Sequence, residues 1–374
     1  MTVLIKGAIY EHEKTKKLLH YLPEKSIVFL WHEDLDGVAV DGLIEAKVKA
    51  VVNGKSSMSG HYAHAHIKKL LDAGIPVFDV VQLTREQGGI WYKGEEAVID
   101  KNELIILNEN QPRCTAASLL PYTYQLITQK LSEAQTYYSE QFDRFVQNTI
   151  NYAKNESIWF QKDPEFPSIL NKVRDREVFI IARNTDYERD IRAMKKTLKQ
   201  KDIIIIAVDG AADGLLKNKL VPDFIIGDMD SISEKSLQCG AELLCHVHPN
   251  GHSPGMNRLD QLGIQANPIR FVGTSEDVAI AASYWSGAAR LYLIGCRMGM
   301  REFLEKGRAG MGATWLCRMQ AGELITDLKG IHKIIGYGPW LHGGQLKRMF
   351  HDTVLPFMIE RFPLVKKKEV LHHD

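Results

Sequence analysis

The chain has 374 residues, 45% of them hydrophobic, which is enough to bury two or three separate cores. A formal net charge of +1 gives no overall attraction for nucleic acid, so the composition argues against a nucleic-acid-binding protein. Five cysteines without a C-x-x-C pair exclude a disulfide framework and favour a reducing cytoplasm. The sequence has no run of ~20 apolar residues and no N-terminal signal segment, so no membrane span is expected.

Residues 1–115 are predicted to form an α/β domain. An apolar strand at 27–31 leads into an acidic turn, and a helix at 38–46, a strand at 48–52 and a helix at 62–71 follow. Further strands are expected at 76–78, 89–91, 96–99 and 104–107. The order resembles the swivelling phosphohistidine domain of phosphoenolpyruvate-utilising enzymes, in which a Ser-rich loop precedes a helix.

Two groups of polar residues in this domain have both a structural and a functional interpretation. His61, His64 and His66 have a spacing that favours solvated or capping side chains over a phosphocarrier or metal site. The acidic turn follows a buried strand, and its residues are either site residues or a polar turn that caps the next helix. These acidic residues are Glu33, Asp34 and Asp36.

Residues 116–164 are predicted to be a long helical linker. No Gly or Pro occurs between residues 125 and 158, and apolar residues recur at spacings of three, four or seven. A helix of about thirty residues is ~45 Å long, longer than one small domain. It therefore packs along both domains or pairs with a second chain, and we expect a homodimer.

Residues 165–322 are predicted to form a doubly wound, mostly parallel sheet. Strands are expected at 177–182, 203–208, 224–226, 242–245, 269–271 and 290–294, with helices at 187–199, 211–216, 275–285 and 313–320. Parallel strands joined by crossover helices end at one edge of the sheet, which is where open α/β folds bind ligands.

Three aspartates follow two of these strands. Asp209 ends the run at 203–208, and Asp228 and Asp230 follow the strand at 224–226 in a Gly-Asp-x-Asp-Ser sequence. Carboxylate oxygens suit Mg²⁺, and the preceding Gly227 permits close approach of another group. The alternative is that these residues only punctuate turns and cap helices. Their convergence favours a magnesium phosphate site.

Other residues at the same edge are candidates for binding phosphate. Arg183 ends the strand at 177–182, and Gly273, Thr274 and Ser275 lie where a strand passes into a helix, whose free N–H groups favour anions. The loop at 307–312 carries Arg308 but is not a Walker motif. It either closes over a ligand or caps the next helix, and we favour the cap.

Residues 323–374 are predicted to hold two short strands, at 324–326 and 331–335, and an amphipathic segment at 346–362 with a kink at Pro356. This C-terminal tail can dock on a partner, on a membrane surface or on its own domain.

Several motifs carry a resemblance to known families. Residues 209–213 and 222–231 resemble the catalytic half of thiamine pyrophosphokinase, with its DGGAN and PDxIIGDxDS patterns. A longer series of motifs, spread in order over most of residues 5–335, resembles the SteA-like cytokinetic-ring proteins, which contain a thiamine-pyrophosphokinase-like domain. That set includes residues 32–36, 239–242, 248–251, 254–255 and 273–279.

The resemblance implies a site for Mg²⁺ and for ATP or another nucleotide. Asp228 and Asp230 would hold the metal, and Asp209 or Glu276 would assist or take the acceptor proton. The residues implied in nucleotide or phosphate binding are Arg183, Gly210, Gly227, Ser231, Gly273, Thr274 and Ser275.

The sequence departs from the kinase pattern at two positions, where Gly273 stands for an Asp and Ala279 for a Lys. Too few residues follow 322 for the β-sandwich that helps the kinases hold thiamine, so efficient thiamine pyrophosphate synthesis is not expected. We therefore expect a nucleotide-binding relative with a cell-division or regulatory role, with a division-protein partner at the C-terminal tail. The alternative is an active, ATP-dependent pyrophosphokinase.

Overall fold

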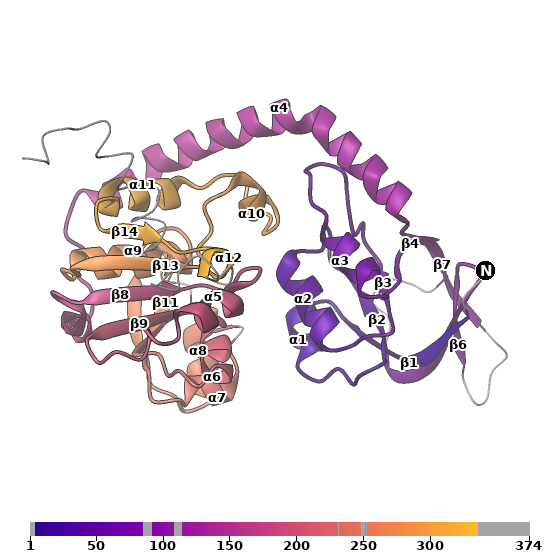
Figure 1. Cartoon of the computed structure of the whole chain (residues 1–374), viewed down its shortest axis with the longest axis horizontal. Helices are drawn as coiled ribbons and strands as arrows, with labels where there is room; N and C mark the ends of the chain where they lie inside the picture. Colours follow the sequence, from indigo (N-terminus) through magenta and orange to yellow (C-terminus); the bar gives the residue numbers. More distant parts are fainter. Residues whose placement is uncertain are drawn as a thin grey trace, which may run out of the picture.

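The computed structural model describes residues 4–84, 92–107, 114–230, 232–247, 251 and 253–335 of the chain. Figure 1 shows two α/β halves that are joined across the top by one long helix, α4 (Tyr124–Glu156). The predicted strand at 89–91 and the amphipathic tail at 346–362 lie outside the described residues. Among the helices described, none combines the length and the apolar character needed to cross a membrane.

The sheet of the N-terminal half has seven strands and closes into a barrel. Around the barrel the strands follow the order β1 (Ile5–His12), β2 (Ile27–Leu30), β3 (Ala50–Asn53), β4 (Val77–Leu83), β7 (Cys114–Pro121), β6 (Glu103–Leu107) and β5 (Lys93–Asp100). β1 to β4 pair in parallel, and the pairs that involve β5, β6 and β7 are antiparallel.

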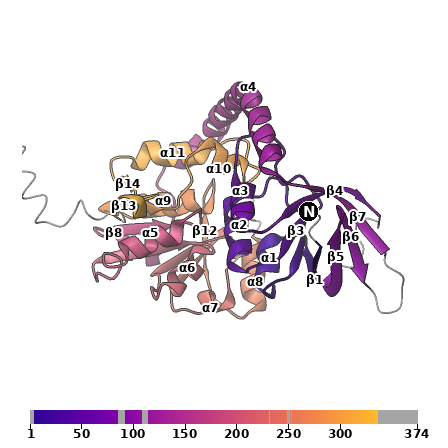
Figure 2. The ribbon, with the colours of Figure 1, turned by 45° about the vertical axis from the view of Figure 1, so that its right-hand side comes forward.

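Successive side chains of a strand point to opposite faces of the sheet, so the apolar residues of this half fall into two clusters. On β2, Ile27 and Phe29 belong to the cluster made by strand residues from around the barrel. Val28 and Leu30 belong to a second cluster, with residues of the outer helices α1 (Thr15–Leu19), α2 (Gly37–Glu45) and α3 (His66–Asp72). In Figures 1 and 2, α1 and α2 lie on the side of the barrel that faces the second half.

The barrel corrects three expectations for the N-terminal half. The predicted boundary at residue 115 cuts β7, and neither β1 nor β7 was predicted. β7 has the sequence CTAASLLP, whose small residues favour strands weakly, and β1 contains Gly7 and charged residues. The helix predicted from residue 62 begins at His66, and the segment before it instead contacts Asp34, since His64 Nε2 lies 3.2 Å from Asp34 Oδ1.

Helix α4 packs on both halves through its two ends. Ile127, near its start, joins the apolar cluster of α1 to α3, and Phe145, near its end, lies 6.2 Å from the ring of Phe303 in the second half. Tyr138 and Phe142, between these contacts, are exposed and stack on each other with ring centroids 5.9 Å apart. The first of the two alternatives for this helix, packing along both domains, therefore holds.

The second half contains a seven-stranded sheet in which every pair is parallel. Its strands follow the order β12 (Asn267–Arg270), β11 (Glu242–Val247), β10 (Phe224–Gly227), β9 (Ile203–Val208), β8 (Glu177–Ile181), β13 (Arg290–Ile294) and β14 (Ile325–Asp327). The chain runs from β8 outward to β12 and then returns to the other side of β8 with β13. The order of the strands thus reverses between β8 and β13.

Helices cover both faces of this sheet. Ile203 and Ile205 of β9 pack on the face covered by α5 (Tyr187–Met194), α6 (Ala211–Lys217), α7 (Glu234–Leu237) and α8 (Pro254–Gln261). Ile204 and Ile206 pack on the opposite face, against α9 (Ser275–Trp285), α11 (Gly312–Ala321) and the 3₁₀ helix η2 (Ser168–Val173). Burial on both faces explains why β9 is an uninterrupted apolar run. The 3₁₀ helix η1 (Ser157–Phe160) follows α4, and α10 (Met300–Leu304) precedes α11.

One predicted strand is wrong in this half. The segment predicted as a strand at 331–335 contains the helix α12 (His332–Ile335). A short apolar run cannot be assigned to a strand or a helix by periodicity alone. The other strand predicted beyond residue 322 is present as β14, and it extends the parallel sheet rather than forming a separate unit.

Candidate functional site

A cavity of about 300 Å³ lies at the carboxyl ends of the strands in the second half. Its wall includes residues that follow β8, β9, β10 and β13, so it lies next to the point where the strand order reverses, the usual position of a ligand site in an open parallel sheet. The residues lining the cavity are Lys16, Val38, Arg183, Val208, Asp209, Gly210, Asp228, Thr274, Ser275, Glu276, Arg297, Glu302, Phe303, Lys306 and Arg308.

Asp209 is held at the end of β9 by contacts with β10 and α9. Its backbone has a φ of 48°, and its amide donates to the carbonyl of Ile226 over 3.0 Å. The carboxylate accepts hydrogen bonds from the Met229 amide at 3.3 Å and from the Ser275 hydroxyl. A Cβ on Gly227 would lie 1.8 Å from Asp209 Oδ1, so only glycine at position 227 leaves room for this carboxylate.

Asp228 and Asp230 lie on either side of a tight turn at the end of β10. Met229 between them has a φ of 59°, and the Asp230 amide donates to Asp228 Oδ1 over 3.1 Å. Arg258 of α8 donates to the Met229 carbonyl, and also to the Ile232 carbonyl over 2.8 Å, which fixes the turn. Asp228 lines the cavity, whereas Asp230 contacts Asp228 outside the lining.

The carboxyl groups of this edge raise one another's pKa. Burial raises the pKa of Asp209, and the neighbouring Asp228 carboxylate raises it further. Burial also raises the pKa of Asp228, to which the hydrogen bond and the charge of Asp230 add. For both groups, burial and the neighbouring carboxyl groups outweigh the opposing effect of the Lys16 charge. A cation bound beside Asp228 would offset the repulsion.

These residues fit a magnesium ion. Within the described part of the chain, no three His, Cys, Asp or Glu side chains cluster closely enough to hold a metal ion by themselves. Mg²⁺, however, is commonly bound through one or two carboxylates, water and substrate phosphates. Asp228 and Asp230, the predicted metal pair, have side chains within hydrogen-bonding reach of each other and would supply the two carboxylates, and the cavity that Asp228 lines has room for the remaining ligands.

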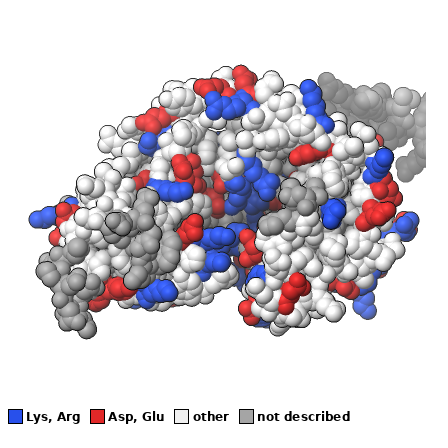
Figure 3. Space-filling model, turned by 180° about the vertical axis from the view of Figure 1, so that it is seen from behind, with Lys and Arg blue, Asp and Glu red and all other residues white. Residues whose placement is uncertain are grey.

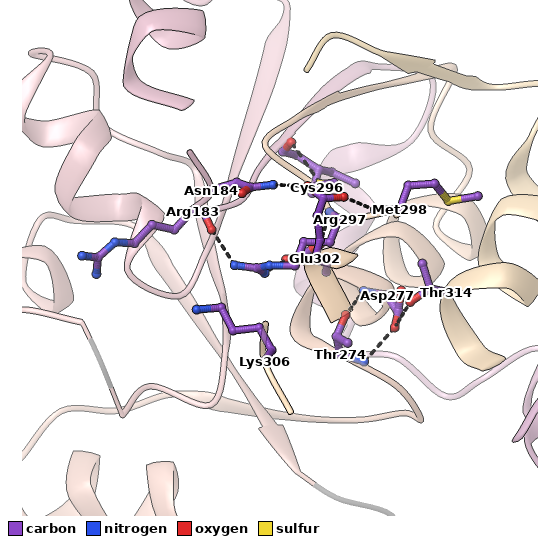
Figure 4. A network of polar contacts seen from close by, with 12 residues as sticks. Arg183, Asn184, Thr274, Asp277, Cys296, Arg297, Met298, Glu302, Lys306 and Thr314 are labelled. Carbon is purple, nitrogen blue, oxygen red and sulfur yellow. Dashed lines mark hydrogen bonds and ion pairs between the residues drawn. The ribbon is translucent and has the colours of Figure 1, made fainter. Parts of the chain in front are cut away.

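The lining of the cavity is strongly basic. Lys and Arg side chains gather in the hollow between the two halves (Figure 3), and five of them line the cavity: Lys16, Arg183, Arg297, Lys306 and Arg308. Arg297 is anchored by three contacts. Its side chain and its amide donate to the two oxygens of Glu276. Its Nη2 donates to the Arg183 carbonyl over 2.7 Å (Figure 4). Such a wall suits a phosphate-bearing ligand.

The N-terminus of α9 forms another side of the cavity. Thr274 and Asp277 make a capping box, and Asp277 also accepts a hydrogen bond from the Thr314 hydroxyl over 2.9 Å (Figure 4). Burial raises the pKa of Asp277 to about 6. Ser275 follows the cap and donates its hydroxyl to Asp209, so α9 helps to fix the acidic edge.

The structure brings most, but not all, of the predicted site residues together. The cavity is lined by Arg183, Asp209, Gly210, Asp228, Thr274, Ser275 and Glu276. Gly227 lies behind Asp209, and Gly273 lines a separate cavity of about 320 Å³. Ser231 lies outside the described residues. Glu276 differs from its expected role, because both of its oxygens hold Arg297.

Position 279 and the loop at 307–312 also have defined places in the structure. Ala279, which was compared with a kinase Lys, is fully buried in the apolar cluster between α9 and the sheet, so this position does not face the cavity. The loop at 307–312 does not cap α11 with a side chain: the N-cap residue Met311 makes no such bond. Instead, Arg308 of this loop lines the cavity.

The histidines and the acidic turn of the first half also have defined contacts. His64 is 2% exposed and lies 3.2 Å from Asp34 Oδ1, and His66 lies 2.8 Å from Glu305 Oε1 of the second half. The interpretation of these two histidines as solvated or capping was wrong, whereas His61 is exposed. Asp36 caps α2 by accepting from the Ala39 amide over 2.9 Å.

Sequence reasoning missed Lys16, Arg297 and Lys306. The rule that identified Arg183, a basic residue just beyond a strand end, would also have identified Arg297 after β13. No local pattern marks Lys16, which belongs to the other half of the molecule, or Lys306, which lies between α10 and α11.

The region with the three aspartates matches a known family. Residues 194–250 match the sequence model described as "Thiamin pyrophosphokinase, catalytic domain". A 6-hydroxymethyl-7,8-dihydropterin pyrophosphokinase from Methanocaldococcus jannaschii is 31% identical over 88 residues, which cover 21% of this chain and 36% of that protein. The chain thus spans about a third of the length of this curated relative.

Solved structures give weaker likenesses. A thiamine pyrophosphokinase from Bacillus subtilis aligns with a TM-score of 0.26 and 15% identity, over 41% of this chain and 60% of that one. A 3-isopropylmalate dehydratase from M. jannaschii aligns with a TM-score of 0.24 and 14% identity, over 35% of this chain and 89% of that one. At these TM-scores neither structure adds to the argument. The second domain is therefore thiamin pyrophosphokinase-like over the segment that carries Asp209, Asp228 and Asp230, and its curated relative is a pyrophosphokinase.

Proposed function

We propose that the cavity binds the polyphosphate group of a magnesium nucleotide such as ATP, and that the chain transfers pyrophosphate from it to a hydroxyl acceptor other than thiamine. The observation that carries this proposal is the pairing of carboxylates with bases across one cavity. Asp209 and Asp228 line the cavity together with the basic residues Arg183, Arg297 and Lys306. The match of residues 194–250 to a pyrophosphokinase catalytic domain supports the choice of reaction.

In the proposed reaction the acceptor oxygen forms a bond to the β-phosphorus of ATP, the bond from that phosphorus to the α–β bridging oxygen breaks, and AMP leaves. Mg²⁺ held by Asp228 and Asp230 would neutralise charge on the phosphates. Arg297, fixed by Glu276, is positioned to bind a phosphate oxygen without further ordering of its side chain. Asp209 is the candidate to accept the acceptor's proton, because its raised pKa makes its carboxylate a stronger base.

A measurement of AMP release from ATP tests this proposal. We expect wild type to bind Mg·ATP and to release AMP when a hydroxyl acceptor from a panel including thiamine and hydroxymethylpterins is added. Asp228→Asn should lower the rate by roughly 100-fold, the usual scale for one lost transition-state contact. Asp202→Asn is the matched control, since Asp202 is exposed and precedes β9, at the edge of the sheet away from the cavity. Equal ATP binding by wild type and Asp228→Asn would contradict the proposed site.

A second candidate function is a nucleotide-binding module without turnover, as in a SteA-like protein with a role in cell division. One observation favours it: both oxygens of Glu276 accept hydrogen bonds from Arg297, so this carboxylate is not available as a general base. ATP binding without AMP release for every acceptor tested would support this candidate. A division-protein partner at the C-terminal tail would then be sought by crosslinking.

We also propose a homodimer formed through the middle of α4. Tyr137, Tyr138 and Phe142 are 51%, 50% and 45% exposed between the two regions where α4 packs on the chain's own domains. Light scattering of wild type and a Tyr138→Glu/Phe142→Glu variant decides this point. A dimeric wild type and a monomeric variant are expected, and a monomeric wild type would exclude the dimer.

A further inference from the structure

The cavity has a second wall that comes from the N-terminal domain. Lys16 of α1 and Val38 of α2 line it together with the residues of the second domain. Lys16 is exposed, and its side chain makes no hydrogen bond or ion pair with the part of the chain that the structure describes. Its positive charge acts on both Asp209 and Asp228, where it favours the ionised carboxylates. An unpaired ammonium group therefore faces the acidic edge from the opposite domain.

The N-terminal domain also holds a second lysine in the cavity. Lys306 Nζ lies 2.6 Å from Asp36 Oδ2, and Asp36 is 6% exposed. Burial would raise the pKa of Asp36, but the charge and hydrogen bond of Lys306, together with His32 and the Ala39 amide, lower that pKa overall. Glu305, the preceding residue, pairs with His66 of α3 over 2.8 Å. Two consecutive residues of the second domain are thus bonded to the first.

The two domains also approach closely beside the cavity. A Cβ on Gly37, the first residue of α2, would lie 2.3 Å from Thr185 Oγ1 in the loop after β8. Thr185 is two residues from Arg183, which lines the cavity. The amino end of α2 therefore touches the loop that carries one of the phosphate-binding candidates.

We propose that the N-terminal domain is half of the phosphate site: Lys16 binds a phosphate oxygen directly, and Asp36 is a positioning residue that holds Lys306 in place for another. The ligand then bridges the two domains. This inference depends on the proposed function, because it specifies how the same cavity recognises a polyphosphate. It explains how a charge-rich ligand is neutralised without a basic residue at position 279, which lies in the core.

Calorimetric titration with inorganic tripolyphosphate and MgCl₂ tests the role of Lys16. Lys16→Gln should weaken binding roughly tenfold or more, the range for a lost hydrogen bond to a charged group. Lys17→Gln is the matched control, since Lys17 is the next residue of α1, is exposed, and is not among the cavity residues. Lys16→Arg should recover part of the affinity. Equal affinity of wild type and Lys16→Gln would overturn the inference.

A variant of Asp36 tests the positioning of Lys306. Asp36→Asn keeps a side chain that can cap α2 but removes the charge that holds Lys306, so we expect several-fold weaker tripolyphosphate binding without loss of the fold. Circular dichroism checks the fold. Unchanged affinity in this variant would show that Asp36 does not position Lys306 for the ligand.

Hydrogen exchange distinguishes a ligand that bridges the two domains from one that only responds to the overall positive charge of the cavity. Tripolyphosphate should slow exchange of the amides of α1 in wild type and in Lys17→Gln, but not in Lys16→Gln. Binding by wild type without protection of α1 would overturn the bridging geometry and leave the proposed function standing. No binding of tripolyphosphate or ATP by wild type would overturn both.

Discussion

At the scale of single residues, the acidic edge depends on one glycine. Asp209 Oδ1 would lie 1.8 Å, and its Cγ 2.2 Å, from a Cβ at position 227. Gly227→Ala should therefore displace the carboxylate and lower the free energy of unfolding by about 1–3 kcal/mol, the usual cost of overpacking. Urea unfolding measures this. Gly299→Ala is the control, because a Cβ at position 299 would have its nearest neighbour 3.4 Å away and the φ of −88° suits any residue. A loss of stability as large in Gly299→Ala would contradict the steric explanation.

A second residue-scale prediction concerns acid stability. Burial raises the pKa of Glu302, but hydrogen bonds from the amides of Met298 and Gly299 and from Asn184, with the charge of Lys329, lower it to about 2. The folded pKa is thus below the unfolded value of ~4.3, so this group stabilises the fold above that pH and loses its contribution as pH falls toward 2.

Glu302→Gln should consequently destabilise the protein at pH 6 and have a smaller effect at pH 3. Urea midpoints at a series of pH values measure the difference between the variant and wild type. Glu140→Gln, on the exposed side of α4, serves as the control and should change the midpoint little at either pH. A Glu302→Gln effect that does not shrink below pH 4 would refute the assignment.

At the scale of elements, α4 joins the domains through buried residues at its ends and is exposed between them. Thr123 caps its start by accepting from the Leu126 amide, and at its end the Met311 amide donates to Thr149 Oγ1 over 3.2 Å. Phe145 is 3% exposed and packs against Phe303, which lines the cavity. The helix therefore supports the loop that lines the site as well as connecting the two domains.

Phe145→Ala should lower the free energy of unfolding of the second domain by about 3 kcal/mol, because it leaves a cavity under α4. Asp143→Ala, two residues earlier and exposed, should change it by less than about 0.5 kcal/mol. Denaturant unfolding followed by tryptophan fluorescence compares the two variants. Similar losses for both would contradict the packing of Phe145 against the second domain.

At the scale of the whole molecule, the site lies between domains, so ligand binding should stabilise both. Mg·tripolyphosphate at 100 times its dissociation constant should add about 2.7 kcal/mol to stability. Hydrogen exchange of β2 and β9 during a temperature ramp reports each domain separately, and both should unfold at higher temperature. In Lys16→Gln the increase should remain for β9 and be lost for β2. A wild-type response limited to β9 would mean that the ligand contacts only the second domain.

The sequence by itself determined the elements that local pattern specifies. The apolar run of β9, the β10 strand and the turn residues after them predicted where Asp209, Asp228 and Asp230 lie, and α9 and β13 begin and end where predicted. Periodicity and turn chemistry involve neighbouring residues, so they can be read from the chain. Local pattern was too weak to predict two other elements: β7, which is built largely of small residues, and α12, which is a single turn.

Only the tertiary structure decided how the barrel closes and which distant residues complete the site. Lys16 and Asp209 lie in different domains, and the Asp36 contact with Lys306 joins residues that are 270 positions apart. Glu276 looked like a catalytic carboxylate until Arg297 was found on both of its oxygens. Such contacts follow from how the domains pack, which depends on the summed burial and charge of many residues and leaves no trace in the local pattern around any one of them.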